Sequence, residues 1–108
     1  MKNASLQMTI RIITTLQKRF RNSELQVPML LTFLHVANSG EIGMAALEDL
    51  TGVSQAAVSR NVAKLSQGIT LKEPGLGLVE AFEDPTWRRR KIVRLTPRGA
   101  ALIAELAA

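Results

Sequence analysis

Up to about residue 66, apolar side chains recur along the chain at spacings of three and four. Such spacing places them on one face of an α-helix. Pro28 fits the first turn of a helix, and Ser39-Gly40 ends one. The pattern predicts helices over residues 4–22, 28–38, 44–51 and 55–66, with a very short strand over residues 41–43.

From residue 78 the period changes to two, which is typical of strands with one buried face. The strand-like segments are LVEAF over residues 78–82 and KIVRL over residues 91–95, and Asp84-Pro85 marks a turn between them. Thr96-Pro97 then begins a final helix that extends through residue 108. The order of elements predicts a mainly α fold with a small β-hairpin (α+β).

The segment from Gly52 to Leu65, GVSQAAVSRNVAKL, has the features of a tight turn followed by a recognition helix. Gly52 supplies the permissive backbone of a sharp turn, and Ser54 is a good N-cap. The preceding helix offers Ala45, Leu47 and Leu50 to a core. A short helix, a turn and a second helix with this spacing predict a DNA-binding helix-turn-helix over residues 44–66.

The predicted recognition helix has one apolar face and one hydrogen-bonding face. Val58, Val62 and Leu65 recur at spacings of four and three and form the apolar stripe. Gln and Arg side chains can make paired hydrogen bonds to base edges, and Ala can contact a thymine methyl. An ordinary capped helix with a solvated outer face would show the same pattern, so the interpretation depends on the helix-turn-helix context. The hydrogen-bonding face carries Gln55, Ala56, Ser59, Arg60 and Lys64.

The formal net charge is +5, and it is distributed unevenly. Residues 1–53 carry +1, whereas residues 54–108 carry +4. The excess lies in the recognition helix and the segments C-terminal to it, including four consecutive basic residues from Arg88 to Lys91. Such clustering is the electrostatic footprint of a nucleic-acid face, and a basic surface that only confers solubility does not explain it.

Three helices followed by a basic β-hairpin constitute a winged helix, and the second half of the chain resembles the MarR family of bacterial transcription regulators. Those proteins often carry a wing motif of the type DPxDRRxxxVxLTxxG, and the stretch from Asp84 to Gly99 reads DPTWRRRKIVRLTPRG. The run Ala57–Arg60 also resembles the family's recognition helix. The resemblance covers residues 27–106 and implies a winged helix-turn-helix fold and a regulatory function on DNA.

The sequence departs from the family pattern at three places. Trp87 replaces the usual wing aspartate, so the salt bridge that commonly steadies the wing lacks that partner. Residues 69–77 are expected to form an extra loop or turn. The sequence stops soon after Leu106, where family members usually continue into long helices that form the dimer and help enclose an effector pocket. We therefore expect either a dimer built from the first and last helices or a truncated or smaller relative.

The sequence thus predicts a sequence-specific, double-stranded DNA-binding transcription regulator, acting as a homodimeric repressor on a palindromic operator. The recognition helix is expected to face bases in the major groove, and the wing to reach a neighbouring minor groove or its phosphates. One wing arginine is expected to brace the hairpin. The predicted contacts are Gln55, Ala56, Ser59 and Arg60 for bases, Ser54 and Lys64 for phosphates, and Arg88, Arg89 and Arg90 for the wing.

The first helix, within residues 1–22, is predicted to form the dimer because its apolar stripe is broader than a single domain needs. In the final helix, residues 97–108, Leu102, Ile103 and Leu106 are expected to add apolar surface to that dimer. All 108 residues are expected to fold as one winged-helix domain, with the wing over residues 78–95.

Two alternatives use the same fold. One is a plasmid or phage replication or partition factor that binds DNA through the same module. The other is a winged-helix protein-interaction module without nucleic acid. The second alternative predicts an uncharged recognition helix or an acidic wing, and the sequence has neither.

Other functional classes lack support in the sequence. One His and no Cys remove most nucleophile–base pairs and thiolate metal sites, so no enzyme activity, cofactor or metal is expected. No apolar run is long enough to span a bilayer, and basic residues interrupt any signal-peptide region. We therefore expect a cytoplasmic protein without a membrane partner. The sequence identifies no small-molecule effector.

Overall fold

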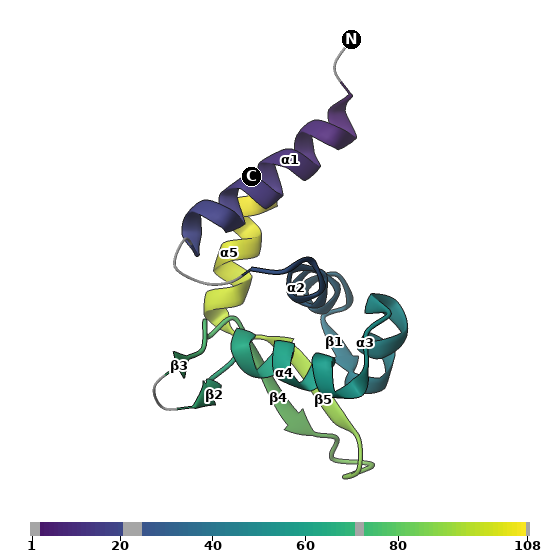
Figure 1. The fold of residues 1–108 in the computed structure, drawn as a ribbon. Coiled ribbons are helices and arrows are strands. Elements are labelled where there is room, and N and C mark those ends of the chain that lie inside the picture. Colours follow the sequence, from purple (N-terminus) through teal and green to yellow (C-terminus); the bar gives the residue numbers. More distant parts are fainter. Residues whose placement is uncertain (1–2, 21–24, 71–72, 108) are drawn as a thin grey trace.

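The computed structural model describes residues 3–20, 25–70 and 73–107, and Figure 1 shows how its elements are arranged. The predicted second, third and fourth helices are confirmed, with ends that differ by one residue at most. The first predicted helix ends three residues early, at Arg19; residues 21, 22 and 108, which the predicted helices include, lie outside the described residues. The helices are α1 (Ala4–Arg19), α2 (Val27–Ser39), α3 (Met44–Thr51), α4 (Gln55–Leu65) and α5 (Pro97–Ala107).

A small antiparallel sheet carries the hairpin. Its strands are β1 (Glu41–Gly43), β4 (Val79–Glu83) and β5 (Lys91–Leu95), with β5 in the middle. Val93 of β5 lies opposite Ala81 of β4 on one side and opposite Ile42 of β1 on the other. The sheet therefore ties the hairpin to the short strand that precedes α3. This arrangement confirms the predicted mainly α fold with a small β wing.

The stretch between α4 and the hairpin forms a second small sheet. β2 (Gly68–Thr70) pairs with β3 (Glu73–Pro74) in antiparallel orientation. The predicted extra loop or turn is therefore a short hairpin, and its residues 71 and 72 lie outside the described residues. Gly75 approaches the end of α4 so closely that a Cβ there would lie 2.2 Å from the carbonyl oxygen of Ser66. The insertion thus packs on the C-terminal end of α4.

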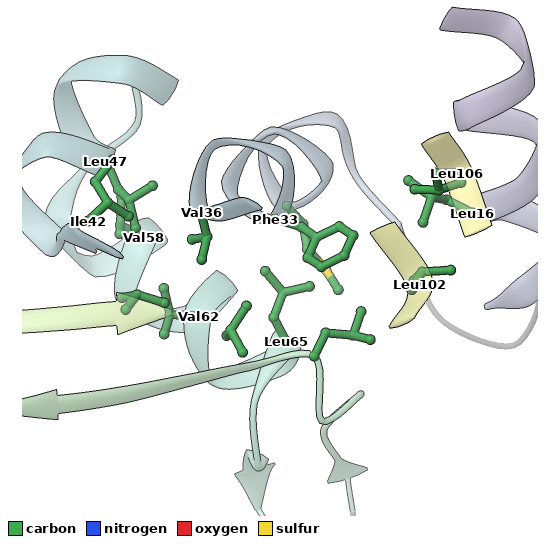
Figure 2. Close-up of a cluster of buried hydrophobic side chains, with 14 residues drawn as sticks. Leu16, Phe33, Val36, Ile42, Leu47, Val58, Val62, Leu65, Leu102 and Leu106 are labelled. Atoms are coloured by element: carbon green, nitrogen blue, oxygen red, sulfur yellow. The ribbon is translucent and has the colours of Figure 1, made fainter. Parts of the chain in front are cut away.

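The core is a single cluster of aliphatic side chains with one phenylalanine (Figure 2). Phe33 and Val36 of α2 lie at its centre, and Val58 and Val62 of α4 pack on the side toward the sheet. Burying one side chain of this size stabilises the fold by about 1.5–3 kcal/mol. The cluster therefore holds α2, α3 and α4 on the sheet as one unit.

The last turns of α1 pack against α5 (Figures 1 and 2). Leu16 of α1 lies beside Leu106, and Leu102 lies one turn earlier in α5. All three are at most 4% exposed. The prediction that Leu102 and Leu106 offer apolar surface to a dimer is therefore wrong, because α1 of the same chain covers them. Ile103 is partly buried against the same core.

Two of the three predicted core positions in α3 also differ. Leu47 is completely buried, as expected, but Leu50 is 51% exposed and Ala45 is exposed. α3 is eight residues long and packs on α2, α4 and β1. Its packing centres on Leu47, so the apolar residue in its last turn remains at the surface.

The N-terminal half of α1 extends away from the rest of the molecule (Figure 1). The exposed apolar side chains of α1 include Leu6 (61%), Ile10 (63%) and Ile13 (47%). They follow a spacing of four and three, so they share one face of the helix. This face has no partner within the described residues.

Candidate nucleic-acid interface

Two residues set the turn between α3 and α4. Gly52 has φ +72°, a left-handed conformation that other residues rarely adopt, and its amide donates a hydrogen bond to the Glu48 carbonyl oxygen at 2.9 Å. Ser54 caps α4, because its Oγ accepts a hydrogen bond from the Ala57 amide at 3.2 Å. The predicted turn and cap are both confirmed. Together they fix the direction in which α4 leaves α3.

One face of α4 is apolar and packs in the core, and the opposite face is exposed to solvent. Val58, Val62 and Leu65 are at most 4% exposed and pack into the core. Lys64, in the last turn, is partly buried. The exposed residues of the first two turns are Gln55, Ala56, Ser59 and Arg60. The predicted base-contacting residues therefore all lie at the surface.

The wing loop between β4 and β5 is closed by backbone hydrogen bonds. The Asp84 amide donates to the Arg90 carbonyl oxygen (2.8 Å), and the Trp87 amide donates to the Asp84 carbonyl oxygen (3.2 Å). The Arg90 amide donates in turn to the Trp87 carbonyl oxygen (2.9 Å). These bonds give the loop a defined backbone conformation, which orients the side chains between them.

The Asp84 side chain braces this loop from within. Its Oδ1 accepts hydrogen bonds from the Thr86 amide (2.9 Å) and hydroxyl (2.8 Å), and its Oδ2 lies 3.7 Å from an Arg90 guanidinium nitrogen. The Thr86 hydrogen bonds, and then the Arg90 charge, hold the pKa of Asp84 below its ordinary value of 3.8. The carboxylate is therefore charged at neutral pH and attracts Arg90.

The three adjacent wing arginines have different surroundings. The Arg90 side chain turns toward the sheet, where a Cβ added at Gly43 would lie 2.9 Å from its Nε. Arg88 and Arg89 are exposed, and neither forms an ion pair within the described residues. The expectation that one arginine braces the hairpin is confirmed for Arg90. Asp84 is its acidic partner, so the wing has a salt bridge although Trp87 replaces the usual aspartate.

The recognition helix and the wing meet at a shallow hollow. Gln55 and Ser59, two predicted base contacts, share this concave surface with Arg89 of the wing. Lys91 also belongs to it and was not among the predicted contacts, although the basic run in the sequence points to it. The hollow is lined by Met44 and Glu48 of α3, Gln55, Val58 and Ser59 of α4, and Arg89 and Lys91.

A second hollow follows α4 toward its C-terminal end. It is lined by Ala56, Ser59, Arg60, Ala63 and Gly68, so the β2 end of the insertion borders the recognition helix. Of the other predicted contacts, Ser54 lies at the N-cap and Lys64 in the last turn of α4. Arg88 lies on the wing loop and lines neither hollow.

Arg94 shows that a surface arginine of the wing need not be available to a ligand. Its Nε donates to Glu80 at 2.6 Å, and a terminal nitrogen lies 3.9 Å from Glu41. Its guanidinium also stacks over the Phe82 ring, 4.5 Å from the ring centre. These neighbours neutralise Arg94 on the outer face of the sheet. The excess positive charge of the wing is therefore carried by Arg88, Arg89 and Lys91.

Two other kinds of feature are not found in the described part of the chain. No three histidine or acidic side chains there are grouped so as to hold a metal ion. No helix there is long and apolar enough to cross a membrane.

The fold and the exposed face of α4, the second helix of the helix-turn-helix, define a winged helix-turn-helix protein. Comparison with known proteins agrees. No family model matches the sequence, and no curated protein matches it. Among solved structures, RV1404 from Mycobacterium tuberculosis has a TM-score of 0.71 at 25% identity, over 96% of this chain and 64% of that one. BpsR of Bordetella bronchiseptica, whose DNA binding is regulated by 6-hydroxynicotinic acid, has a TM-score of 0.63 at 23% identity over 94% of this chain.

A mutant of E. coli MarR in complex with operator DNA is also similar, with a TM-score of 0.65 at 18% identity over 93% of this chain. The chain spans 66% of the length of both BpsR and this MarR, so it corresponds to about two thirds of each neighbour. These likenesses show the fold: the chain has the winged helix of MarR-type transcriptional regulators. The resemblance predicted from the sequence is thereby confirmed at the level of the fold.

Proposed function

We propose that the chain is a sequence-specific, double-stranded DNA-binding transcription regulator, a repressor that acts as a homodimer. The observation that carries the proposal is the hollow shared by the exposed face of α4 and the basic wing. Gln55 and Ser59 lie there beside Arg89 and Lys91. Hydrogen-bonding side chains next to exposed cations match a duplex, which presents base edges in its grooves and phosphates along their rims.

In this proposal α4 enters the major groove, with its N-terminal turns toward the bases. Gln55, Ala56, Ser59 and Arg60 would face base edges, since they occupy the exposed face of those turns. The Ser54 hydroxyl keeps a proton to donate to a phosphate while its oxygen caps the helix. Lys64 would bind a phosphate further along the groove.

The wing would contact the duplex beside the recognition helix. Arg88 and Arg89 are exposed and would bind phosphates or the minor groove, and we add Lys91 to this set. Of the three arginines, we assign to Arg90 the support of the loop, because its guanidinium lies 3.7 Å from Asp84 and beside Gly43. Neutralising phosphates with such cations contributes affinity that falls as salt rises.

The exposed apolar face of α1 supports the homodimer. Leu6, Ile10 and Ile13 form an apolar stripe whose exposure to water is unfavourable. A second copy of α1 would cover this stripe. We keep the proposed division of the single domain: residues 1–22 for the dimer, 44–66 for the helix-turn-helix and 78–95 for the wing. The final helix, predicted over residues 97–108, would support α1, since its described part, α5, packs on α1.

The test is selection of bound duplexes from a random pool, followed by mass measurement of the complex. We expect an enriched palindromic site bound by two chains. The triple variant Gln55→Ala, Ser59→Ala, Arg60→Ala should lose selection, whereas Arg94→Ala, which also removes one surface cation, should retain it. Absence of any enriched sequence would contradict the proposal and favour a protein-interaction module. Enrichment of a repeat that functions as a replication origin would favour the replication or partition alternative.

A further inference from the structure

The single tryptophan of the sequence lies on the wing loop with its side chain in water. Trp87 is 63% exposed and is not part of the core cluster. An indole ring has a large apolar area, and leaving it in water forgoes the stabilisation that burial would provide. The fold therefore does not explain this residue by packing, which is the ordinary role of a loop aromatic.

The loop presents Trp87 with little backbone freedom. Its own amide and carbonyl are both engaged, with Asp84 at 3.2 Å and with Arg90 at 2.9 Å. Thr86, directly before it, is held by two hydrogen bonds to Asp84. The loop is therefore already ordered before a ligand contacts the ring. Binding then costs little conformational entropy of the protein, which favours it.

The charges around Trp87 indicate the kind of ligand. Arg88 and Arg89 follow it directly and are exposed, and Lys91 begins the strand that comes after the loop. An apolar protein surface over the ring would bring these cations to a low-dielectric interface without partners, which is unfavourable. The minor groove of DNA offers apolar sugar walls flanked by phosphates, so it matches both the ring and the cations.

We propose that Trp87 packs against the deoxyribose wall of a minor groove while Arg88 and Arg89 bind the phosphates at its edge. The inference rests on the proposed function, and it assigns to the wing an uncharged contact in addition to its electrostatic ones. Proteins that bind minor grooves frequently place apolar side chains in the groove. The wing then contributes affinity that high salt does not remove.

Because the sequence has one tryptophan and no tyrosine, tryptophan emission reports on this position alone. The probe is a selected duplex carrying a dye at one end, whose anisotropy measures binding independently of tryptophan. On binding, we expect the Trp87 emission to shift to shorter wavelength and its quenching by acrylamide to fall several-fold. Binding that leaves both signals unchanged overturns the inference while the proposed function stands.

A variant series provides the second measurement. Trp87→Ala should weaken binding about 5- to 100-fold, the range typical of removing an aromatic side chain that stacks on nucleic acid, and Trp87→Phe should weaken it less. Since indole carries no charge, the slope of log affinity against log salt should stay the same in both variants. The matched control is Val27→Ala, which removes an equally exposed apolar side chain (66%) from the start of α2 and should bind normally.

Three other outcomes overturn the inference. The first is unchanged affinity in a Trp87→Ala variant with a native circular dichroism spectrum. The second is a reduced salt slope in that variant, because the effect would then come from displaced arginines. The third is an emission shift that depends on protein concentration without DNA, since a second copy of the chain would then cover the ring. If no duplex binds by anisotropy, the proposed function itself fails, which is a separate result.

Discussion

At the scale of single residues, the surface arginines differ in their surroundings. Arg94 is neutralised by Glu80 and Glu41, and Arg90 is directed toward Asp84. Arg60 and Arg89 have no such partner within the described residues and border the two hollows at α4. Their availability follows from local neighbours and not from exposure alone, which gives each of them a distinct expected effect.

The first prediction concerns Arg60. It lies on the second turn of α4, on the exposed side, where an arginine can pair with a guanine. Arg60→Ala is expected to cost about 1–3 kcal/mol of binding free energy at a selected site and to relax the preference at one base pair. Affinities for a panel of single-base variants of the site measure both effects. A uniform loss across the panel would place Arg60 on a phosphate instead.

The second prediction concerns Gly99, in the first turn of α5. Thr96 caps this helix, since its Oγ1 accepts a hydrogen bond from the Gly99 amide (3.1 Å) and donates one to the Gly77 carbonyl oxygen (2.6 Å). The Leu78 carbonyl oxygen then lies where a side chain at residue 99 would be: an added Cβ would be 2.0 Å from it. This close approach gives a steric reason for the glycine in the LTPRG stretch.

Gly99→Ala is therefore expected to destabilise the protein by about 1–3 kcal/mol, as overpacking does. Helix propensity alone predicts the opposite sign, a gain of about 1 kcal/mol. Urea unfolding decides between them. Ala100→Gly, at the exposed neighbouring position, is the control and should cost only the propensity difference. A stabilised Gly99→Ala would show that the start of α5 does not pack against Leu78.

At the scale of elements, the loop of the wing is stabilised by contacts within itself, because the Asp84 side chain accepts hydrogen bonds from Thr86 and faces Arg90. The pKa of Asp84 is lowered by the Thr86 hydrogen bonds and by Arg90, so the charged form stabilises the folded loop. That stabilisation is present above the ordinary value of 3.8. It is lost as the pH falls through the lowered pKa of the folded state, because protonation then occurs in both states.

The third prediction follows from this pH dependence. Asp84→Asn keeps the shape and an oxygen acceptor but removes the charge, so it should be less stable than the original protein at neutral pH. The difference in unfolding free energy should shrink as the pH falls below 3.8. Urea unfolding at a series of pH values measures it. A difference that persists undiminished in acid would mean that the charge of Asp84 does not brace the wing.

The fourth prediction separates the wing arginines by salt dependence. Arg88→Ala with Arg89→Ala should reduce the slope of log affinity against log salt by about 0.9 for each phosphate that is no longer neutralised. Extending the change to Arg90 should weaken binding further, through the loss of loop support. Arg94→Ala is the matched control and should leave the slope unchanged. If the double variant folds and keeps its affinity and slope, the wing does not contact DNA.

At the scale of the whole molecule, the last turns of α1 pack on α5, while the rest of α1 carries an exposed apolar face. Leu102 and Leu106 are buried, and Leu106 lies beside Leu16 of α1, so α5 serves the interior of one chain. In the proposed homodimer, the exposed half of α1 would carry the surface for a second copy. A two-fold dimer would present its two α4 helices about 34–36 Å apart, or at a multiple of that distance, on one face of the duplex.

The fifth prediction tests this arrangement. Ile10→Glu places a charge in the middle of the exposed stripe on α1 and should convert a dimer to a monomer that binds a half-site weakly. Met8→Glu makes the same chemical change about 200° away around the helix and should remain dimeric. Sedimentation at tens of micromolar measures the mass. A monomeric original protein at that concentration, binding a single half-site, would contradict the dimer.

The sequence by itself determined the elements and the local geometry of the candidate site. Helical spacing located α2, α3 and α4, and the Gly52 turn and Ser54 cap follow from backbone chemistry within a few residues. The wing strands follow from the period of two. These features depend on neighbours close in sequence, so a single sequence specifies them.

Only the tertiary structure decided which side chains of each element are covered and by which neighbours. Periodicity gives Leu50 and Leu102 the same apolar character, yet Leu50 is exposed and Leu102 is buried. Arg89 and Arg90 are adjacent and identical in chemistry, but Gly43 of β1, 47 residues earlier, gives Arg90 a surface to lie on. Such contacts join segments far apart in the chain, and a one-dimensional pattern of hydrophobicity and charge contains no information on which of them meet.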